Sequence, residues 1–301
     1  MQKILITGSN GFIGQHLIPQ LAESYDVYCL TSDLRNHASV KAEIEQYQPD
    51  MIVHLAARTE VEQSFYEQTT FADINFTGTV NLIEAATQVA SRPKFIFAST
   101  MEVFGWQPVS DDIYHGHIPA IIPVFDRNTP ANPNAPYAVA KLACEKYLEY
   151  AHRSLGLEYV IFRQTNGYGR KDNTFFVTEQ IITQMLAGDV CNLGYAEPYR
   201  NFLYIDDLIN AYQCAVNNFD SLANQIYTLG PNNALSIKEY ANIIAKKLNW
   251  NGTINWNTKP RRPGEIYLLN SDHKEFTQAT GWVPKVNLNE GLDLTIAAWK
   301  K

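Results

Sequence analysis

Tyr137 and Lys141 form the first pair whose types and spacing suggest chemistry. They stand four residues apart in Tyr137-Ala-Val-Ala-Lys141, and side chains at that spacing share one face of a helix. A tyrosine hydroxyl ordinarily has a pKa of about 10, and a neighbouring ammonium group lowers that pKa. We therefore expect Tyr137 to act as a base near neutral pH. The same spacing is common on amphipathic helices, so this assignment depends on the rest of the chain.

A glycine-rich stretch near the start of the chain predicts a phosphate-binding turn. Gly8, Gly11 and Gly14 follow the apolar run Ile4 to Ile6 and open an amphipathic stretch. Gly8 permits a tight turn, Gly11 lets backbone amides approach a pyrophosphate, and Gly14 lets the helix lie close to the strand. The start of a helix also supplies oriented N–H groups for an anion. The pattern indicates a dinucleotide cofactor rather than a merely tight turn.

The end of the next apolar run bears on which dinucleotide binds. Asp33 follows that run, and Arg35 comes two residues later. Asp33 is the type of residue that accepts hydrogen bonds from an adenosine ribose, which favours NAD. Arg35 is the type that meets the 2′-phosphate of NADP. We prefer NAD and leave NADP open, with a solvated loop as the alternative for both residues.

Alternating strands and helices would position these groups. The predicted strands are short apolar runs, each followed by polar or glycine residues: Ile4 to Ile6, Val27 to Leu30, Met51 to Leu55, Phe95 to Ala98 and Tyr159 to Phe162. The predicted helices have apolar residues at three- and four-residue spacing: Gly14 to Ala22, Val40 to Tyr47, Ala72 to Ala90, Tyr137 to Ser154 and Asp206 to Asn217. This order predicts an α/β fold with a Rossmann-like, doubly wound parallel sheet.

The composition changes in the second half of the chain. The predicted elements are shorter there, and Asn, Gly, Pro and Tyr become frequent. We predict a smaller, interleaved α/β domain for substrate, made of about 166–200 plus 231–301. Residues 1–165 plus about 201–230 would form the dinucleotide-binding domain. The proline-rich stretch 106–136 is expected to be largely irregular, as lids and binding loops are. Its apolar run Ile118 to Phe125 would alternatively pack on a neighbouring subunit.

The composition limits the partners. The 301 residues carry 24 Lys and Arg against 31 Asp and Glu, a net charge of −7, so we expect no nucleic-acid partner and no basic membrane anchor. The four cysteines lie far apart, which argues against a disulfide framework. No apolar stretch reaches the ~20 residues of a membrane span, and no signal-peptide core follows Met1. We expect a cytoplasmic protein.

Motifs along nearly the whole chain resemble those of the extended short-chain dehydrogenase/reductase family, and among its members the nucleotide-sugar epimerases and dehydratases. The motifs are Thr7 to Gly14, His54-Leu-Ala-Ala57, Asn75 with Gly78-Thr79, Ser99 to Gly105, Tyr137 with Lys141, Arg163 to Gly169, Arg200 to Asp207, Arg262-Pro-Gly-Glu265 and Gly281-Trp-Val-Pro284. The resemblance implies that cofactor contacts come from Gly8, Asn10, Gly11, Phe12, Ile13, Gly14, Asp33, Leu34, Leu55, Ala56, Ala57, Asn75, Tyr137 and Lys141.

The resemblance also implies a reaction on a nucleotide sugar. A sugar hydroxyl, usually at C4, passes its proton to Tyr137 while its hydride goes to the nicotinamide. Thr100 would hydrogen-bond the reacting oxygen and orient it; alternatively, its hydroxyl merely closes a strand end. Lys141 would also hold the nicotinamide ribose.

Glu102 favours one reaction within the family, because Thr-x-Glu is typical of 4,6-dehydratases and UDP-glucuronate decarboxylases. In the dehydratases the carboxylate abstracts the C5 proton, water then leaves from C6, and hydride returns to C6. Many dehydratases have an aspartate between the two as the acid, but here Met101 stands at this substrate-contacting position. Either Glu102 does both jobs or the reaction departs from dehydration. A 4-epimerase and a 4-keto-sugar reductase remain open, as does a non-catalytic dinucleotide sensor, and Glu102 alternatively forms a surface salt bridge.

The substrate end and the assembly are likewise implied by the resemblance. Arg200 and Arg262 would face the nucleotide diphosphate, and Asn166 would reach a phosphate or sugar hydroxyl. An ion pair of Arg200 with Asp206 and Asp207 is the alternative. Family members usually form homodimers through two helices per subunit, here expected to be 72–90 and 137–154. His115 and His117 lack a confirming second pair of ligands, so we expect no metal.

Overall fold

The core of the molecule is a six-stranded parallel sheet. The computed structural model describes residues 1–300, and its sheet has the strand order β10-β5-β4-β3-β1-β2. The strands are β1 (Lys3–Thr7), β2 (Asp26–Cys29), β3 (Met51–His54), β4 (Lys94–Thr100), β5 (Tyr159–Gln164) and β10 (Gln225–Leu229). All neighbouring pairs run parallel. The predicted Rossmann-like fold class is confirmed, and each of the five predicted strands is present.

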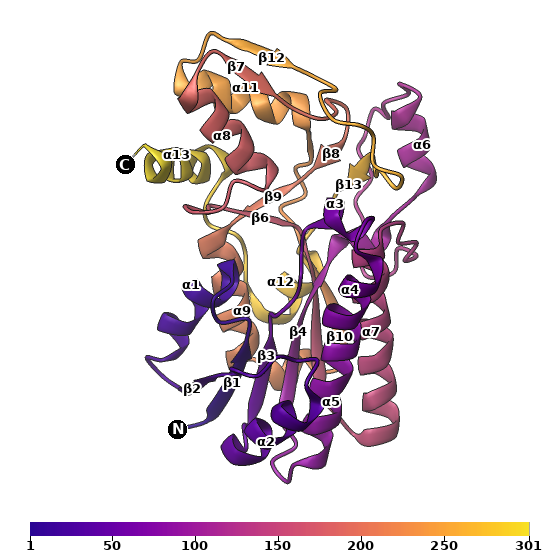
Figure 1. The fold of residues 1–301 in the computed structure, drawn as a ribbon, viewed down its shortest axis with the longest axis vertical. Helices are drawn as coiled ribbons and strands as arrows, with labels where there is room; N and C mark the ends of the chain where they lie inside the picture. Colours follow the sequence, from indigo (N-terminus) through magenta and orange to yellow (C-terminus); the bar gives the residue numbers. More distant parts are fainter. Residues whose placement is uncertain (301) are drawn as a thin grey trace.

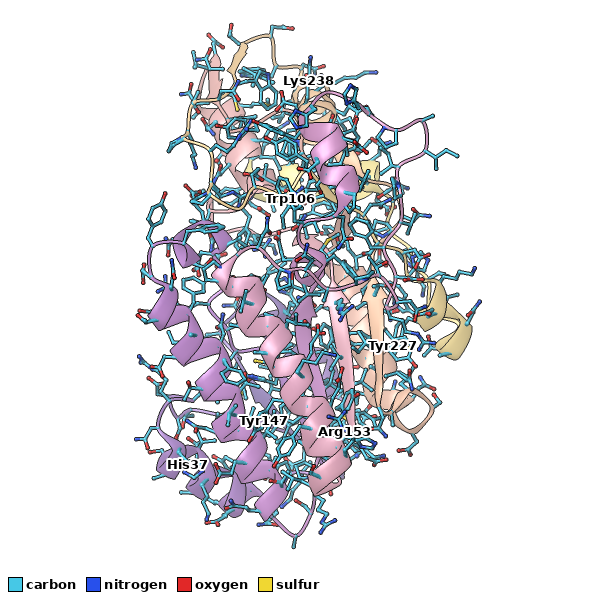
Figure 2. All side chains as sticks on the ribbon, turned by 90° about the vertical axis from the view of Figure 1, so that its right-hand side faces the viewer. His37, Trp106, Tyr147, Arg153, Tyr227 and Lys238 are labelled. Atoms are coloured by element: carbon cyan, nitrogen blue, oxygen red, sulfur yellow. The ribbon has the colours of Figure 1, made fainter. Side chains whose placement is uncertain are left out.

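Helices cover both faces of this sheet (Figure 1). Their apolar sides form two clusters with alternate side chains of each strand, since neighbouring residues of a strand point to opposite faces. One face carries α1 (Phe12–Leu21), α9 (Ile205–Asn217) and the short α10 (Phe219–Leu222). The other carries α2 (His37–Tyr47), α5 (Gly78–Gln88) and α7 (Pro136–Leu155). Figure 2 shows α7 along the sheet, with Tyr147 and Arg153 labelled on it.

The helix expected over 72–90 is not one regular helix. It consists of α4 (Gln68–Ala72), a π-helical turn η1 (Asp73–Thr77) and α5, with the short α3 (Val61–Ser64) before it. Within this turn the Asn75 carbonyl accepts hydrogen bonds from the side chains of Thr79 and Cys144, at 2.6 and 3.1 Å. Such local widening often marks a functional site. Hydrophobic periodicity does not distinguish a π-helical turn from an α-helical one.

A smaller cap lies over the carboxyl ends of the strands (Figure 1). It contains α8 (Val177–Ala187), α11 (Ile237–Leu248) and α13 (Leu288–Trp299), packed around a third apolar cluster. Its short strands pair across distant segments: β6 (Asn166–Tyr168) with β9 (Phe202–Tyr204), β7 (Val190–Asn192) with β12 (Thr253–Asn255), and β8 (Tyr199–Arg200) with both β11 (Leu235–Ser236) and β13 (Leu268–Leu269). Between β13 and α13 the chain returns to the sheet, because Phe276 in α12 (Lys274–Thr280) and Trp282 join its first cluster.

The stretch 106–136 is largely irregular, as expected, apart from α6 (Pro108–Tyr114). Phe125 anchors it by a bridge to Ser271 and by burial in an apolar cluster under the cap. Ile118 and Ile121 are exposed. Among residues 1–300, no helix is both long and apolar enough to cross a membrane.

Candidate active site

A cavity of about 1060 Å³ opens between the sheet and the cap. Parallel α/β sheets bind ligands at this edge, beyond the carboxyl ends of their strands. Most of the predicted site residues line it: Gly8, Asn10, Gly11, Phe12, Ile13, Gly14, Leu55, Ala57, Thr100, Glu102, Tyr137, Lys141, Asn166, Arg200 and Arg262. Five of them do not: Asp33, Leu34, Ala56, Asn75 and Met101. The stretch 106–136 contributes no lining residue.

The glycine turn between β1 and α1 fits a dinucleotide, because backbone packs where side chains would otherwise stand. A Cβ on Gly14 would lie 2.4 Å from the Gly8 carbonyl oxygen, and one on Gly8 would lie 2.7 Å from the Ala56 nitrogen. Gly8 also has a φ of +73°, a conformation that favours glycine. The first amides of α1 thus face the cavity without side chains in between, as a pyrophosphate requires.

Replacing Gly14 by alanine is expected to lower the free energy of unfolding by about 1 to 3 kcal/mol, because the added methyl group overpacks this contact. It is also expected to weaken dinucleotide binding, since α1 has to move away from β1. Urea denaturation and calorimetric titration with NAD measure the two effects. Gly188→Ala is the matched control, because nothing lies within 4 Å of a Cβ there; equal stability of the two variants would contradict the account.

A buried hydrogen-bond chain holds the loop after β3 against this turn. Thr7 Oγ1 lies 2.6 Å from His54 Nδ1, and His54 Nε2 lies 2.8 Å from Thr79 Oγ1. Because the Thr79 hydroxyl donates to the Asn75 carbonyl, His54 must donate from Nε2 and accept at Nδ1. Burial and the Lys141 charge hold the pKa of His54 well below its usual value, which keeps this neutral form. The chain fixes the backbone that carries Leu55 and Ala57.

Asn75 and Ala56 act on the site from behind this loop rather than by lining the cavity. The Asn75 side chain accepts from the Arg58 backbone N–H at 2.8 Å and donates to the Arg58 carbonyl at 2.9 Å. Ala56 donates its N–H to Thr7 Oγ1 at 3.1 Å. Both residues therefore support the turn and the loop, whereas the sequence had predicted direct cofactor contacts.

Asp33 and Leu34 also lie outside the cavity lining. Leu34 packs under α5, where a Cβ on Gly78 would approach its side chain to 2.9 Å. Asp33 and Arg35 form an exposed ion pair, with Oδ2 and Nη2 2.5 Å apart. The Arg35 guanidinium lowers the pKa of Asp33 to about 2. The two residues that were alternatives for recognising the adenosine ribose are thus bound to each other.

Thr100, Tyr137 and Lys141 come together at the end of β4. Thr100 is the last residue of β4, and its hydroxyl accepts from the Glu102 N–H at 3.2 Å, so the predicted strand-end role is present as well. The same hydroxyl faces the Tyr137 phenol and favours its ionised form. Lys141 donates to the Ala98 carbonyl at 2.7 Å and lies 4.6 Å from the centre of the Phe97 ring. The strand and α7 therefore present these three groups together.

The expected lowering of the Tyr137 pKa is wrong for the protein alone. Burial, and after it the Glu102 charge, raise the pKa of Tyr137 above its usual value, although the Thr100 hydroxyl opposes this shift. Burial lowers the pKa of Lys141 to about 8. The spacing of the two residues did not reveal this, because desolvation depends on the surrounding fold. In the protein alone, burial therefore favours the protonated form of the Tyr137 phenol.

Glu102 and Met101 point in different directions from the turn η2 (Met101–Phe104) that follows β4. Glu102 lines the cavity, and burial raises the pKa of its carboxyl, with the Arg200 and Arg262 charges opposing. Met101 is 1% exposed and packs in the apolar cluster with Phe104 and Phe125. The predicted substrate contact of Met101 is therefore corrected: its side chain fills the core next to the cavity.

Arg200, Arg262 and Glu265 form one wall of the cavity. Arg262 donates two hydrogen bonds to Glu265, of 2.6 and 2.8 Å, and Arg200 Nη2 lies 3.6 Å from the same carboxylate. The alternative ion pair of Arg200 with Asp206 and Asp207 is not formed. Arg200 pairs with Glu265, and Asp207 accepts from the Lys285 and Val286 amides. The two guanidinium groups face the cavity beside Glu265 and Glu102, and guanidinium groups suit phosphate oxygens.

Further lining residues had not been assigned a role from the sequence. Glu265 was visible only as part of a motif. Arg170, on the connection after β6, and Phe176, at the start of α8, also line the cavity. Arg170 and Phe176 are close in the chain and contact each other, but Phe12, the other ring against Arg170, lies far away in the chain, so local spacing gave no signal. Within residues 1–300, no three His, Cys, Asp or Glu side chains gather as metal ligands.

Comparison with known proteins decides the family. The model of the NAD dependent epimerase/dehydratase family matches residues 4–230, most of the chain. The chain belongs to this family. It is therefore an NAD-dependent enzyme, which confirms the predicted family, enzyme class and cofactor. The glycine turn between β1 and α1 fits this cofactor.

Individual relatives include both reaction types. A putative UDP-glucose 4-epimerase of Methanocaldococcus jannaschii is 29% identical, over 99% of this chain and 98% of the relative. A dTDP-D-glucose 4,6-dehydratase of Mus musculus is 27% identical, over 100% and 89% of the two chains. Among solved structures, a UDP-glucose 4-epimerase of Thermus thermophilus in complex with NAD aligns with a TM-score of 0.86, 25% identity and 99% coverage of both chains.

Proposed function

We propose that this enzyme catalyses a 4,6-dehydratase-type elimination on a nucleotide sugar. The observation that carries the proposal is Glu102, a second acid–base group in the cavity besides Tyr137. Oxidation and reduction at one sugar carbon need only Tyr137, whereas elimination also needs a group that moves the C5 proton. In this proposal 1–165 with 201–230 hold the cofactor, and 166–200 with 231–301 cap the sugar nucleotide.

NAD, when bound, supplies the hydride acceptor and donor, and its oxidised nicotinamide ring carries a positive charge. Gly8, Gly11 and Gly14 hold its pyrophosphate, and Lys141 holds its ribose. Tyr137 takes the proton of the C4 hydroxyl, while Thr100 orients that oxygen. Added positive charge favours the phenolate that burial alone disfavours.

Glu102 does two jobs in this scheme. Its carboxylate takes the C5 proton made acidic by the C4 ketone, and the same group then gives a proton to the C6 hydroxyl, which leaves as water. The hydride that the bound cofactor would return then adds at C6 while a proton from solvent adds at C5, so the net change is the loss of one water. A raised pKa suits a group that must both accept and donate near neutral pH. Met101 cannot share the work, since a thioether has no proton to give and its side chain lies in the core.

The substrate end holds the nucleotide diphosphate in this scheme, with Arg200, Arg262 and Asn166 as its partners. Replacing Arg262 by methionine is expected to raise KM for the nucleotide sugar by about 10- to 100-fold, with a smaller effect on kcat, because a charge-assisted hydrogen bond is lost. Arg262→Lys should restore part of the affinity. Arg153→Met, on the exposed end of α7, is the control, and steady-state kinetics would contradict the role if KM did not change.

A 4-epimerase is the second candidate. The burial of Met101 favours it, because no separate acid serves the C6 hydroxyl, and the relative from Methanocaldococcus jannaschii bears that name. In that reaction the ketone rotates and is reduced on its other face, and Glu102 moves no proton. A 4-keto-sugar reductase would use the same groups with NADPH.

A panel of UDP-, GDP-, CDP- and dTDP-sugars tests the proposal. Each is incubated with the purified enzyme and read by mass spectrometry. Elimination gives a product lighter by one water, whereas epimerisation gives a product of unchanged mass.

We also propose that the protein forms a homodimer through α5 and α7. Val139 and Tyr150, both in α7, are exposed apolar residues on this surface.

A further inference from the structure

Arg170 connects the glycine turn to the cap from within the cavity. Its guanidinium carbon lies 4.0 Å from the centre of the Phe12 ring and 3.7 Å from that of Phe176. Phe12 is the first residue of α1, directly after the turn, and Phe176 caps the start of α8. Cation–π contacts on two sides therefore hold the guanidinium between the cofactor-binding turn and the cap.

The hydrogen-bonding capacity of Arg170 is only partly used. Nη1 donates to the Gly167 carbonyl at 2.5 Å, and the nearest carboxylate, of Glu179, is 4.0 Å from it. Glu179 accepts instead from the backbone amides of Gly169 and Arg170. Among residues 1–300, Nε and Nη2 donate no hydrogen bond to protein, although the side chain is only 12% exposed. Burial lowers the pKa of Arg170 to about 10, so the group stays charged.

A cation in this state is suited to an anionic ligand. The side chain is mostly buried, but its free nitrogen atoms are not sealed from solvent, and Arg170 lines the cavity, so these donors can bond a ligand there. The phenyl ring on which Arg170 lies belongs to the residue that follows Gly11. The anion expected at that end of the cavity is the pyrophosphate of the cofactor, and guanidinium groups match phosphate oxygens in shape and charge.

We propose that Arg170 binds the cofactor pyrophosphate and thereby fastens the cap over the bound dinucleotide. The glycine turn by itself would contact the pyrophosphate only through backbone amides. Arg170 would add a charged side chain from the connection that leads into the cap, so cofactor binding and cap closure would stabilise each other. The proposal concerns the cofactor and does not rest on the elimination reaction.

Calorimetric titration of the full-length protein with ADP-ribose, and separately with UDP and dTDP, tests the proposal. Arg170→Met keeps much of the apolar stem and removes the charge. It is expected to raise the Kd for ADP-ribose by about 10- to 100-fold and to leave the Kd for the nucleoside diphosphates unchanged. Arg153→Met is the control and should leave every Kd unchanged. Added salt should weaken ADP-ribose binding less in Arg170→Met than in the unaltered protein.

Two outcomes would overturn the proposal. One is an unchanged Kd for ADP-ribose in Arg170→Met, which would show that the arginine only joins the two parts of the fold. The other is a selective loss of nucleoside diphosphate affinity, which would assign the arginine to the substrate. Should the methionine variant fail to fold, Arg170→Lys replaces it: a several-fold weaker Kd for ADP-ribose alone supports the proposal, and an unchanged one refutes it.

Discussion

Replacing Tyr137 by phenylalanine is expected to lower kcat by about 10²- to 10⁴-fold while leaving the Kd for NAD nearly unchanged. In the proposed reaction the phenol accepts the proton of the C4 hydroxyl, and loss of a positioned acid–base group has an effect of this size. The ring itself remains, so its packing at the start of α7 is kept. Kinetics on an accepted nucleotide sugar and calorimetric titration with NAD measure the two quantities.

Tyr147→Phe is the matched control for this variant. Tyr147 lies on the same helix, where its ring packs against Phe76 and Tyr150, away from the cavity. It should keep full activity. If Tyr137→Phe also kept full activity, the phenol would have no part in the reaction.

Glu102→Gln is expected to lower the rate of elimination by a similar factor of about 10²- to 10⁴-fold. Glutamine has nearly the same shape but cannot take the C5 proton. Binding of the nucleotide sugar should change little, because Arg200 and Arg262 remain. Glu45→Gln, which removes an exposed acid paired with Lys41, should behave like the unaltered enzyme. A full rate of turnover in Glu102→Gln would exclude the elimination and favour the epimerase.

The pH dependence adds a second readout for Glu102. The carboxylate form is the base, and burial raises its pKa, so kcat/KM should fall as the pH drops through this raised pKa. The glutamine variant should lack that decline. The charge of Glu102 also raises the pKa of Tyr137, so any step limited by the phenolate should reach its plateau at lower pH in the variant.

Local sequence signals were sufficient for five of the six strands of the sheet and for the glycine turn, whereas β10 (Gln225–Leu229) was not predicted. Short apolar runs bounded by polar residues gave β1 to β5, and the spacing of Gly8, Gly11 and Gly14 gave the close contact of α1 with β1. Both features depend on residues close together in the chain. The Tyr137–Lys141 spacing likewise placed the two groups on one face of α7.

The other differences come from packing, desolvation and loop geometry that exist only in the folded chain. Met101 and Glu102 are neighbours in sequence, yet packing against Phe125 buries the first while the second faces the cavity. Desolvation of Tyr137 reversed the expected pKa shift, and the pairing of Asp33 with Arg35 needed a loop geometry that composition does not contain. Arg170 lies between Phe12 and Phe176 only once sheet and cap are assembled.

The most direct test of the elimination is a reaction in deuterated water with a nucleotide sugar that the enzyme accepts. The product is analysed by mass spectrometry and by proton NMR. Because the proton taken from C5 leaves with the water formed at C6, the proton that is later added to C5 comes from solvent. We therefore predict a product that has lost one water and carries deuterium at C5. A product of unchanged mass, inverted at C4 and without deuterium at C5, would contradict the proposed function and identify an epimerase.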